Sequence, residues 1–147
     1  MAATDFTSAG RVVSLVAPDA VSGGGSLTGI ELDSKGWRWL HVTITIGTMA
    51  TAGDGSVTVQ EATTSGGAFA NITGAAFTLT AGDDGAVLHG MIDLEQQSRY
   101  IKVAGTVGAT GATDISVVGV LYGCANTAEY IDATAGGADE LAFTVLT

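Results

Sequence analysis

The sequence predicts an all-β fold, an antiparallel β-sandwich of about eight strands, and three observations favour it. First, the 147 residues include 22 glycines and a single proline, and glycine and threonine disfavour helices whereas β-branched residues suit pleated sheets. Second, several segments alternate apolar and polar residues with the period of two that marks a half-buried strand. Third, a hydrophobic fraction of 46% supplies enough apolar surface to offset the entropy of folding.

The clearest predicted strand covers residues 37–46 and defines a core face. Its inward residues are expected to be Leu40, Val42, Ile44 and Ile46, because they alternate with polar neighbours. The same alternation predicts strands around 57–60, 77–80, 88–94 and 98–107. Two N-terminal strands are expected over 11–17, ended by Pro18, and over 27–32. A jelly roll is the preferred strand order, and an immunoglobulin-like order is the alternative.

The segment 115–122 differs from the other predicted strands because apolar residues occupy both of its faces. A strand that is covered on both sides needs a central place in the fold or a contact with another subunit. The sequence leaves both explanations open. The residues expected on its second face, which are candidate interface residues, are Val118, Val120 and Tyr122.

The charge and the terminal sequence exclude two classes of partner. Fifteen acidic residues against five basic ones give a net charge of −10, which repels phosphate backbones, so no nucleic acid is expected as a partner. No stretch reaches about 20 apolar residues, and the first residues lack the basic and then apolar pattern of a signal peptide. We therefore expect no membrane span, and synthesis in the cytoplasm without a signal peptide.

The sequence offers no constellation of catalytic or metal-binding residues. A hydrolase needs a nucleophile, a base and an orienting group, but His41 and His89 lie within predicted strands without the spacing of a metal motif. The acidic turn at Asp83 and Asp84 lacks the full calcium loop, so a hairpin turn is preferred to a calcium contact. We expect no enzymatic activity, no cofactor and no metal site.

Two tryptophans are the most informative local feature. Trp37 and Trp39 are expected on the side of their strand opposite to the core face. Outward aromatic residues at this spacing either bury themselves in a protein partner or stack on sugar rings. A third interpretation is a second core layer that closes one end of the sandwich. In a glycan-binding module, Tyr100 on the outward side of strand 98–107 would join them.

The pattern of strands ends near residue 123, which predicts a β-sandwich domain over 1–123 and a C-terminal arm over 124–147, with 1–10 as a further N-terminal arm. The C-terminal arm strings small and acidic residues around a few apolar anchors. These anchors either dock back onto the sandwich or lie on a neighbouring subunit. The candidate interface residues of the arm are Tyr130, Ile131, Leu141 and Phe143.

Four segments in the middle third of the chain carry a resemblance to virion proteins of tailed bacteriophages. They are 56–61 (SVTVQE), 68–75 (AFANITGA), 92–94 (IDL) and 99–103 (RYIKV). In that group a strand ending in Gln-Glu leads to a Phe-x-x-Ile-x-Gly-Ala segment and later to an Arg-Tyr-Ile-Arg-Val strand. Here Lys102 replaces the last arginine.

The resemblance implies a small head protein with a decoration, or cement, role. Such a protein is a non-enzymatic homo-oligomer, with a trimer preferred, that binds the major capsid protein on the outer surface of the virion and stabilises the head through added interface. The charge of −10 agrees with an outer location, because the capsid interior faces packaged DNA. The alternatives are a glycan-binding module and a tail or baseplate adhesion component.

Overall fold

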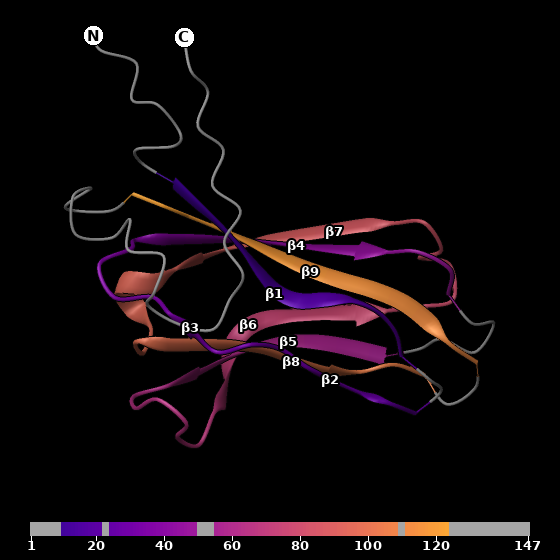
Figure 1. The fold of residues 1–147 in the computed structure, drawn as a ribbon, viewed down its shortest axis with the longest axis horizontal. Coiled ribbons are helices and arrows are strands. Elements are labelled where there is room, and N and C mark those ends of the chain that lie inside the picture. Colours follow the sequence, from indigo (N-terminus) through magenta and orange to yellow (C-terminus); the bar gives the residue numbers. More distant parts are fainter. Residues whose placement is uncertain (1–9, 22–23, 50–54, 109–110, 124–147) are drawn as a thin grey trace, which may run out of the picture.

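The computed structural model of the chain describes residues 10–21, 24–49, 55–108 and 111–123, and this part is almost entirely β (Figure 1). Its strands are β1 (Gly10–Val21), β2 (Ser26–Thr28), β3 (Leu32–Asp33), β4 (Trp39–Ile46), β5 (Gly55–Ala62), β6 (Ala70–Leu79), β7 (Val87–Asp93), β8 (Tyr100–Thr106) and β9 (Thr113–Tyr122). One turn of 3₁₀ helix, η1 (Leu94–Gln96), follows β7. No helix in this part is long and apolar enough to span a membrane.

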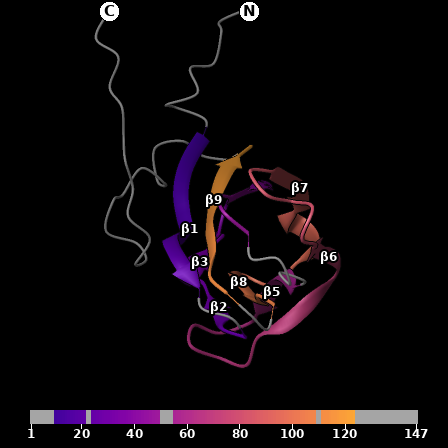
Figure 2. The same cartoon turned by 90° about the vertical axis from the view of Figure 1, so that its right-hand side faces the viewer.

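The strands form two antiparallel sheets that pack face to face (Figures 1 and 2). Sheet 1 has the order β1-β9-β4-β7, and sheet 2 has the order β2-β8-β5-β6 with β3 also paired to β8. When β2 and β3 are counted as one position, this is the strand order of a jelly roll. The predicted sandwich is therefore confirmed, and the strand order excludes the immunoglobulin-like alternative.

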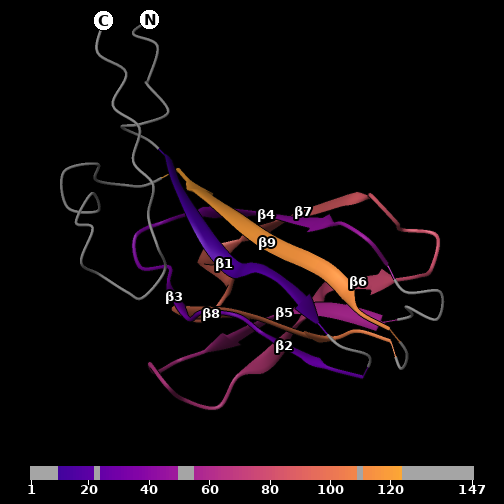
Figure 3. The same cartoon turned by 45° about the vertical axis from the view of Figure 1, so that its right-hand side comes forward.

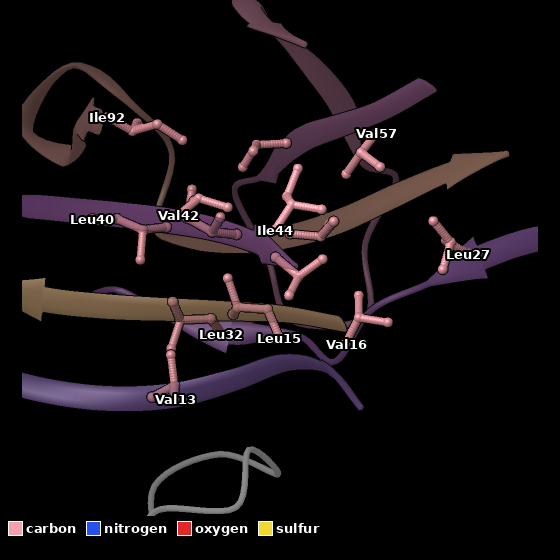
Figure 4. Close-up of a cluster of buried hydrophobic side chains, with 14 of the residues drawn as sticks. Val13, Leu15, Val16, Leu27, Leu32, Leu40, Val42, Ile44, Val57 and Ile92 are labelled. Carbon is pink, nitrogen blue, oxygen red and sulfur yellow. The ribbon is translucent and has the colours of Figure 1, made fainter. Parts of the chain in front are cut away.

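The core lies between the two sheets and is built from the alternating residues that the sequence indicates. Leu40, Val42, Ile44 and Ile46 of β4 are all buried, as predicted. They meet inward residues of the neighbouring and facing strands (Figure 4). The largest of these fully buried partners are Leu15, Leu79, Ile101 and Leu121. The inner face of the sandwich is thus a continuous apolar layer, which is the main stabilising element of such a fold.

Two predicted strand boundaries are wrong. The first strand was expected to end at Pro18, but β1 continues to Val21. Proline is tolerated there because β1 is an edge strand, and its pairing with β9 shifts register between Val16 and Asp19, so no ladder hydrogen bond is required from Pro18.

The expected strand over 27–32 is split into β2 and β3. The break occurs because Gly29 donates its N–H to the carbonyl of Val103 at 2.7 Å while the next residue, Ile30, donates to Leu15 of sheet 1 at 2.9 Å. A side chain at position 29 would lie 2.7 Å from the carbonyl oxygens of Leu15 and Val103. The backbone at residues 29 and 30 therefore bridges β8 of sheet 2 and β1 of sheet 1, and this close approach requires glycine at position 29.

The acidic turn after β6 is not a hairpin, because it joins β6 in sheet 2 to β7 in sheet 1. The Asp83 carboxylate accepts hydrogen bonds from the backbone N–H of Thr80 at 2.7 Å and from its hydroxyl at 3.1 Å. Asp84 accepts from the backbone N–H of Met49 at 2.7 Å. Both carboxylates therefore organise the crossing of the chain from one sheet to the other.

A substitution at Gly105 tests how closely the strands of sheet 2 approach each other. It lies in β8 opposite Val57 of β5, and an added Cβ would lie 2.3 Å from the carbonyl oxygen of Ser56. We expect Gly105→Ala to lower the free energy of unfolding in urea by about 1–3 kcal/mol, because the backbone must shift. Gly82→Ala is the control, since its Cβ would meet only Thr80 Oγ1 at 3.8 Å. Equal stability of the two variants would contradict this packing.

The ion pair between Asp33 and Arg99 should make stability depend on pH. The carboxylate accepts hydrogen bonds from Arg99 Nε at 2.8 Å and Nη2 at 2.6 Å, and these bonds lower the pKa of Asp33 from its ordinary 3.8. The pair therefore stabilises the fold above pH 3.8, and its contribution is lost as the pH falls through the lowered pKa of Asp33. Asp33→Asn should be less stable at neutral pH by up to about 1 kcal/mol, and the difference should vanish in acid. A difference that persists in strong acid would contradict this.

Candidate functional site: the outer face of sheet 1

The candidate site is the outer face of sheet 1, formed by the outward residues of its four strands. Register places these residues in rows across β1, β9, β4 and β7, and Figure 3 shows β9 between β1 and β4. The members of this outer face are Val12, Ser14, Ala20, Trp39, His41, Thr43, Thr45, Val87, His89, Met91, Asp93, Asp114, Ser116, Val118, Val120 and Tyr122. Their inward neighbours alternate with them and fill the core.

This outer face is apolar at its centre. One row runs from Val12 through Val120 and His41 to Met91. The large hydrophobic side chains that are exposed in the described part of the chain all belong to this face: Val12 at 39%, Val87 at 58% and Met91 at 61%. The Tyr122 hydroxyl lies 2.6 Å from the Met91 sulfur. The face thus joins aromatic, thioether and branched aliphatic groups into one patch.

The same face carries few charged residues. Its acidic members are two, Asp93 at the end of β7 and Asp114 at the start of β9. The Asp93 carboxylate accepts the backbone N–H of Glu95 at 3.1 Å at the start of η1. The outer face of sheet 2 differs, because Lys102 lies in its middle opposite Gln60, and Arg99 pairs with Asp33 at its end. The two sides of the sandwich therefore have different surface chemistry.

The structure separates the two tryptophans. Trp37 is only 8% exposed and belongs to the core, so the expectation that it faces outward is wrong. The reason is a turn before β4, in which the Trp37 N–H donates to the Ser34 carbonyl at 3.1 Å, so that strand alternation begins only at Trp39. Trp39 is half-buried on the outer face of sheet 1 beside Tyr122, with the Arg38 guanidinium 5.2 Å from its ring centre.

Tyr100 does not join the tryptophans. It begins β8 and pairs with Asp33 and Ala62 in sheet 2, with the Arg99 guanidinium 5.1 Å from its ring centre. It therefore lies on the opposite sheet from Trp39. The structure does not assemble the three aromatic residues that a glycan platform on Trp37, Trp39 and Tyr100 would need.

β9 has the central position that its two-sided apolar pattern allows, between β1 and β4. Ile115, Val117 and Leu121 are buried in the core. Val118, Val120 and Tyr122, by contrast, are only half-buried on the outer face of sheet 1. The other candidate interface residues, Tyr130, Ile131, Leu141 and Phe143, lie outside the described residues, as do the C-terminal arm and residues 1–9 of the N-terminal arm.

The fold brings together two residues that sequence spacing kept apart. His41 of β4 and His89 of β7 are the two histidines of the chain, and His41 Nε2 lies 3.3 Å from His89 Nδ1. Their rings meet edge to face with centroids 5.3 Å apart. The pairing of β4 with β7 was the missing information, because it is not visible in the spacing of the two residues. The described residues contain no group of three or more His, Cys, Asp or Glu side chains that could hold a metal ion.

A groove lies between β6 and β7, the facing edges of the two sheets. Its volume is about 400 Å³, and its lining includes Val42, Val59, Ile72 and Ile92 from the core. The wall formed by β6 is irregular, because its pairing with β5 shifts register between Thr58 and Gln60, and Gly74 there has a φ of +83°. The Phe-x-x-Ile-x-Gly-Ala segment of the phage resemblance forms this wall.

Three of the four segments that carry the phage resemblance contact one another inside sheet 2, and the fourth, 92–94, ends β7 of sheet 1. Gln60 Nε2 donates to Asn71 Oδ1 at 2.8 Å, and the Glu61 carboxylate accepts the backbone N–H of Ser98. The Lys102 ammonium lies 5.5 Å from the ring centre of Phe69. These residues therefore hold the strands of sheet 2 together, and the outer face of sheet 1 lies apart from them.

No protein family profile and no curated protein sequence matches this chain. Among solved structures, the PBSX exported protein XepA superposes with a TM-score of 0.58 at 11% identity, covering 86% of this chain and 40% of XepA. The SPBc2 prophage-derived protein YomS gives a TM-score of 0.48 at 15% identity, covering 84% of this chain and 99% of YomS. This chain thus spans less than half of XepA. YomS is described as prophage-derived, and the similarity to XepA, at 11% identity, shows a shared fold alone.

Proposed function

We propose that this chain is a non-enzymatic structural protein of a tailed phage, a decoration protein that binds the outside of the head. In this proposal the outer face of sheet 1 docks on the major capsid protein. The observation that carries it is a sheet face with an apolar centre and few charged residues on a chain whose net charge is −10. Such a face is unfavourable in water and is typical of a surface that another protein covers.

The composition of this face is that of an interface core. Interface cores are depleted in charged residues and enriched in Tyr, Trp and Met. Trp39, Tyr122 and Met91 are adjacent here, and Val12 and Val120 extend them across the sheet. The more polar outer face of sheet 2, with Lys102 in its middle, suits solvent.

The resemblance of residues 56–103 to small phage head proteins and the sandwich fold shared with XepA favour a virion location. The acidic charge favours the outer side of the shell, because a subunit inside would face DNA phosphates. The homo-oligomer, with a trimer preferred, belongs to the same proposal. Analytical sedimentation of the purified chain measures its oligomeric state.

Charges placed on the outer face of sheet 1 test the docking surface. Val120→Asp with Met91→Asp should leave the core intact, because both side chains point away from it. We expect binding to undecorated phage heads, measured by co-sedimentation, to fall at least about tenfold, since burial of an unpaired charge costs several kcal/mol.

The matched control is Thr28→Asp with Thr106→Asp, which adds the same charge to exposed positions of sheet 2. It should bind heads like the wild type, and thermal unfolding should show that all three proteins are folded. Equal binding by both double variants would reject this face as the docking surface. A wild-type chain that ignores heads at micromolar concentration would reject the head assignment itself.

The C-terminal residues give a second test. The ladders and the core described here are built from residues 10–123, so we expect removal of residues 128–147 to leave a folded sandwich, as measured by thermal unfolding. If the anchors Tyr130, Ile131, Leu141 and Phe143 bind neighbouring subunits, the truncated chain should no longer protect heads against heat. Full protection by the truncated chain would contradict the bridging role.

A tail or baseplate component would use the same face and differ only in its place on the particle. Antibodies against the purified chain, applied to intact virions under the electron microscope, distinguish the two. Label on the head supports the decoration role, and label confined to the tail rejects it.

A further inference from the structure

We propose that His41 and His89 form a binding site for a divalent transition metal ion that prefers tetrahedral nitrogen coordination, with zinc as the probe. The chain has two histidines, which lie 48 positions apart in the sequence. The pairing of β4 with β7 brings them to the same face of sheet 1, with His41 Nε2 at 3.3 Å from His89 Nδ1.

The distance between the two nitrogens fits the proposed ion. Imidazole nitrogens bind zinc at about 2.0–2.1 Å, so two ligands of a tetrahedral site lie about 3.3–3.4 Å apart. The measured separation of 3.3 Å matches this value. An ion would replace the contact between the two nitrogens and would lie on the solvent side of them, where His89 is exposed. Small rotations of the two side chains would accommodate it.

The strands hold the two imidazoles on a regular scaffold. His41 pairs with Met91, and Thr43 pairs with His89, so the histidines are diagonal neighbours on adjacent antiparallel strands. Such neighbours lie within reach of each other when their side chains are long or aromatic. Ligands on strands keep their positions better than ligands on loops.

The electrostatic surroundings favour a cation. No lysine or arginine belongs to the outer face of sheet 1 as defined above, and the whole chain carries a net charge of −10, which attracts cations. The Met91 sulfur, directly across from His41, is already contacted by the Tyr122 hydroxyl at 2.6 Å. We therefore assign only the two imidazoles as ligands, and two coordination positions remain for water.

Zinc titration of the untagged full-length chain tests the site. The protein is stripped with chelator, zinc chloride is added, and binding is followed by calorimetry. We expect one saturable site per chain in the wild type. His41→Asn and His89→Asn should each weaken it at least about tenfold, since loss of one of two ligands should exceed the 10- to 100-fold effects of altered supporting residues. Thr45→Asn, on the same face and strand, is the matched control and should bind like the wild type.

A spectroscopic readout separates the site from adsorption of zinc to surface carboxylates. Because the chain has two histidines, their imidazole signals in nuclear magnetic resonance spectra are few and assignable, and both should shift together with zinc occupancy. Zinc should also raise the unfolding temperature of the wild type by mass action and should not raise it in the histidine variants. Binding that survives in a His41→Asn/His89→Asn double variant, or no saturable binding at all, would overturn the proposal.

The outcome is independent of the proposed capsid role. Head binding is measured in chelator and in zinc with the same proteins. A chain that binds heads in chelator but never binds zinc rejects the metal site and leaves the decoration role standing. A chain that binds zinc through both histidines but ignores heads supports the metal site and rejects the decoration role.

Discussion

The pairing of β9 with both β1 and β4 is the constraint on which the rest of the molecule depends. β9 crosses the middle of sheet 1 (Figure 3), and its register with its two neighbours decides which side chains enter the core. Because side chains alternate along a strand, a slip by one residue would bring Val118 and Val120 inward and expel Val117 and Leu121. The burial of Leu40 and Leu121 on the inner side therefore fixes the composition of the outer side.

Strands with one buried face could be predicted from the sequence, and features that depend on neighbouring strands could not. The inward residues of β4 and β8 follow from period-two alternation alone, and the structure confirms them. Trp37 was misplaced because the same alternation was extended into a turn closed by Ser34. The continuation of β1 past Pro18 depends on its edge position, which only the strand order reveals.

The candidate site was partly predictable, because alternation within one strand is visible in the sequence and strand pairing is not. Val118, Val120 and Tyr122 could be recognised as a second apolar face from residues 115–122 alone. Their union with Val12, Trp39 and Met91, and the meeting of His41 with His89, required the register of three strand pairs. A single sequence does not contain that register, because alternation determines the face of each residue but does not determine its partner.

The edges of the sheets explain why a flat face is the natural contact surface of this molecule. Exposed edges invite uncontrolled pairing between chains, and here most edges are blunted. β1 carries Pro18 and two register shifts, β2 and β3 contain three and two residues, and β6 is irregular around Gly74. β7 is the regular edge that remains, and it faces the β6–β7 groove. With edge pairing disfavoured, specific association of the described part has to use side chains that project from a face. The outer face of sheet 1 is the side whose apolar centre and few charged residues suit burial, which is why we assign the contact with other subunits to it.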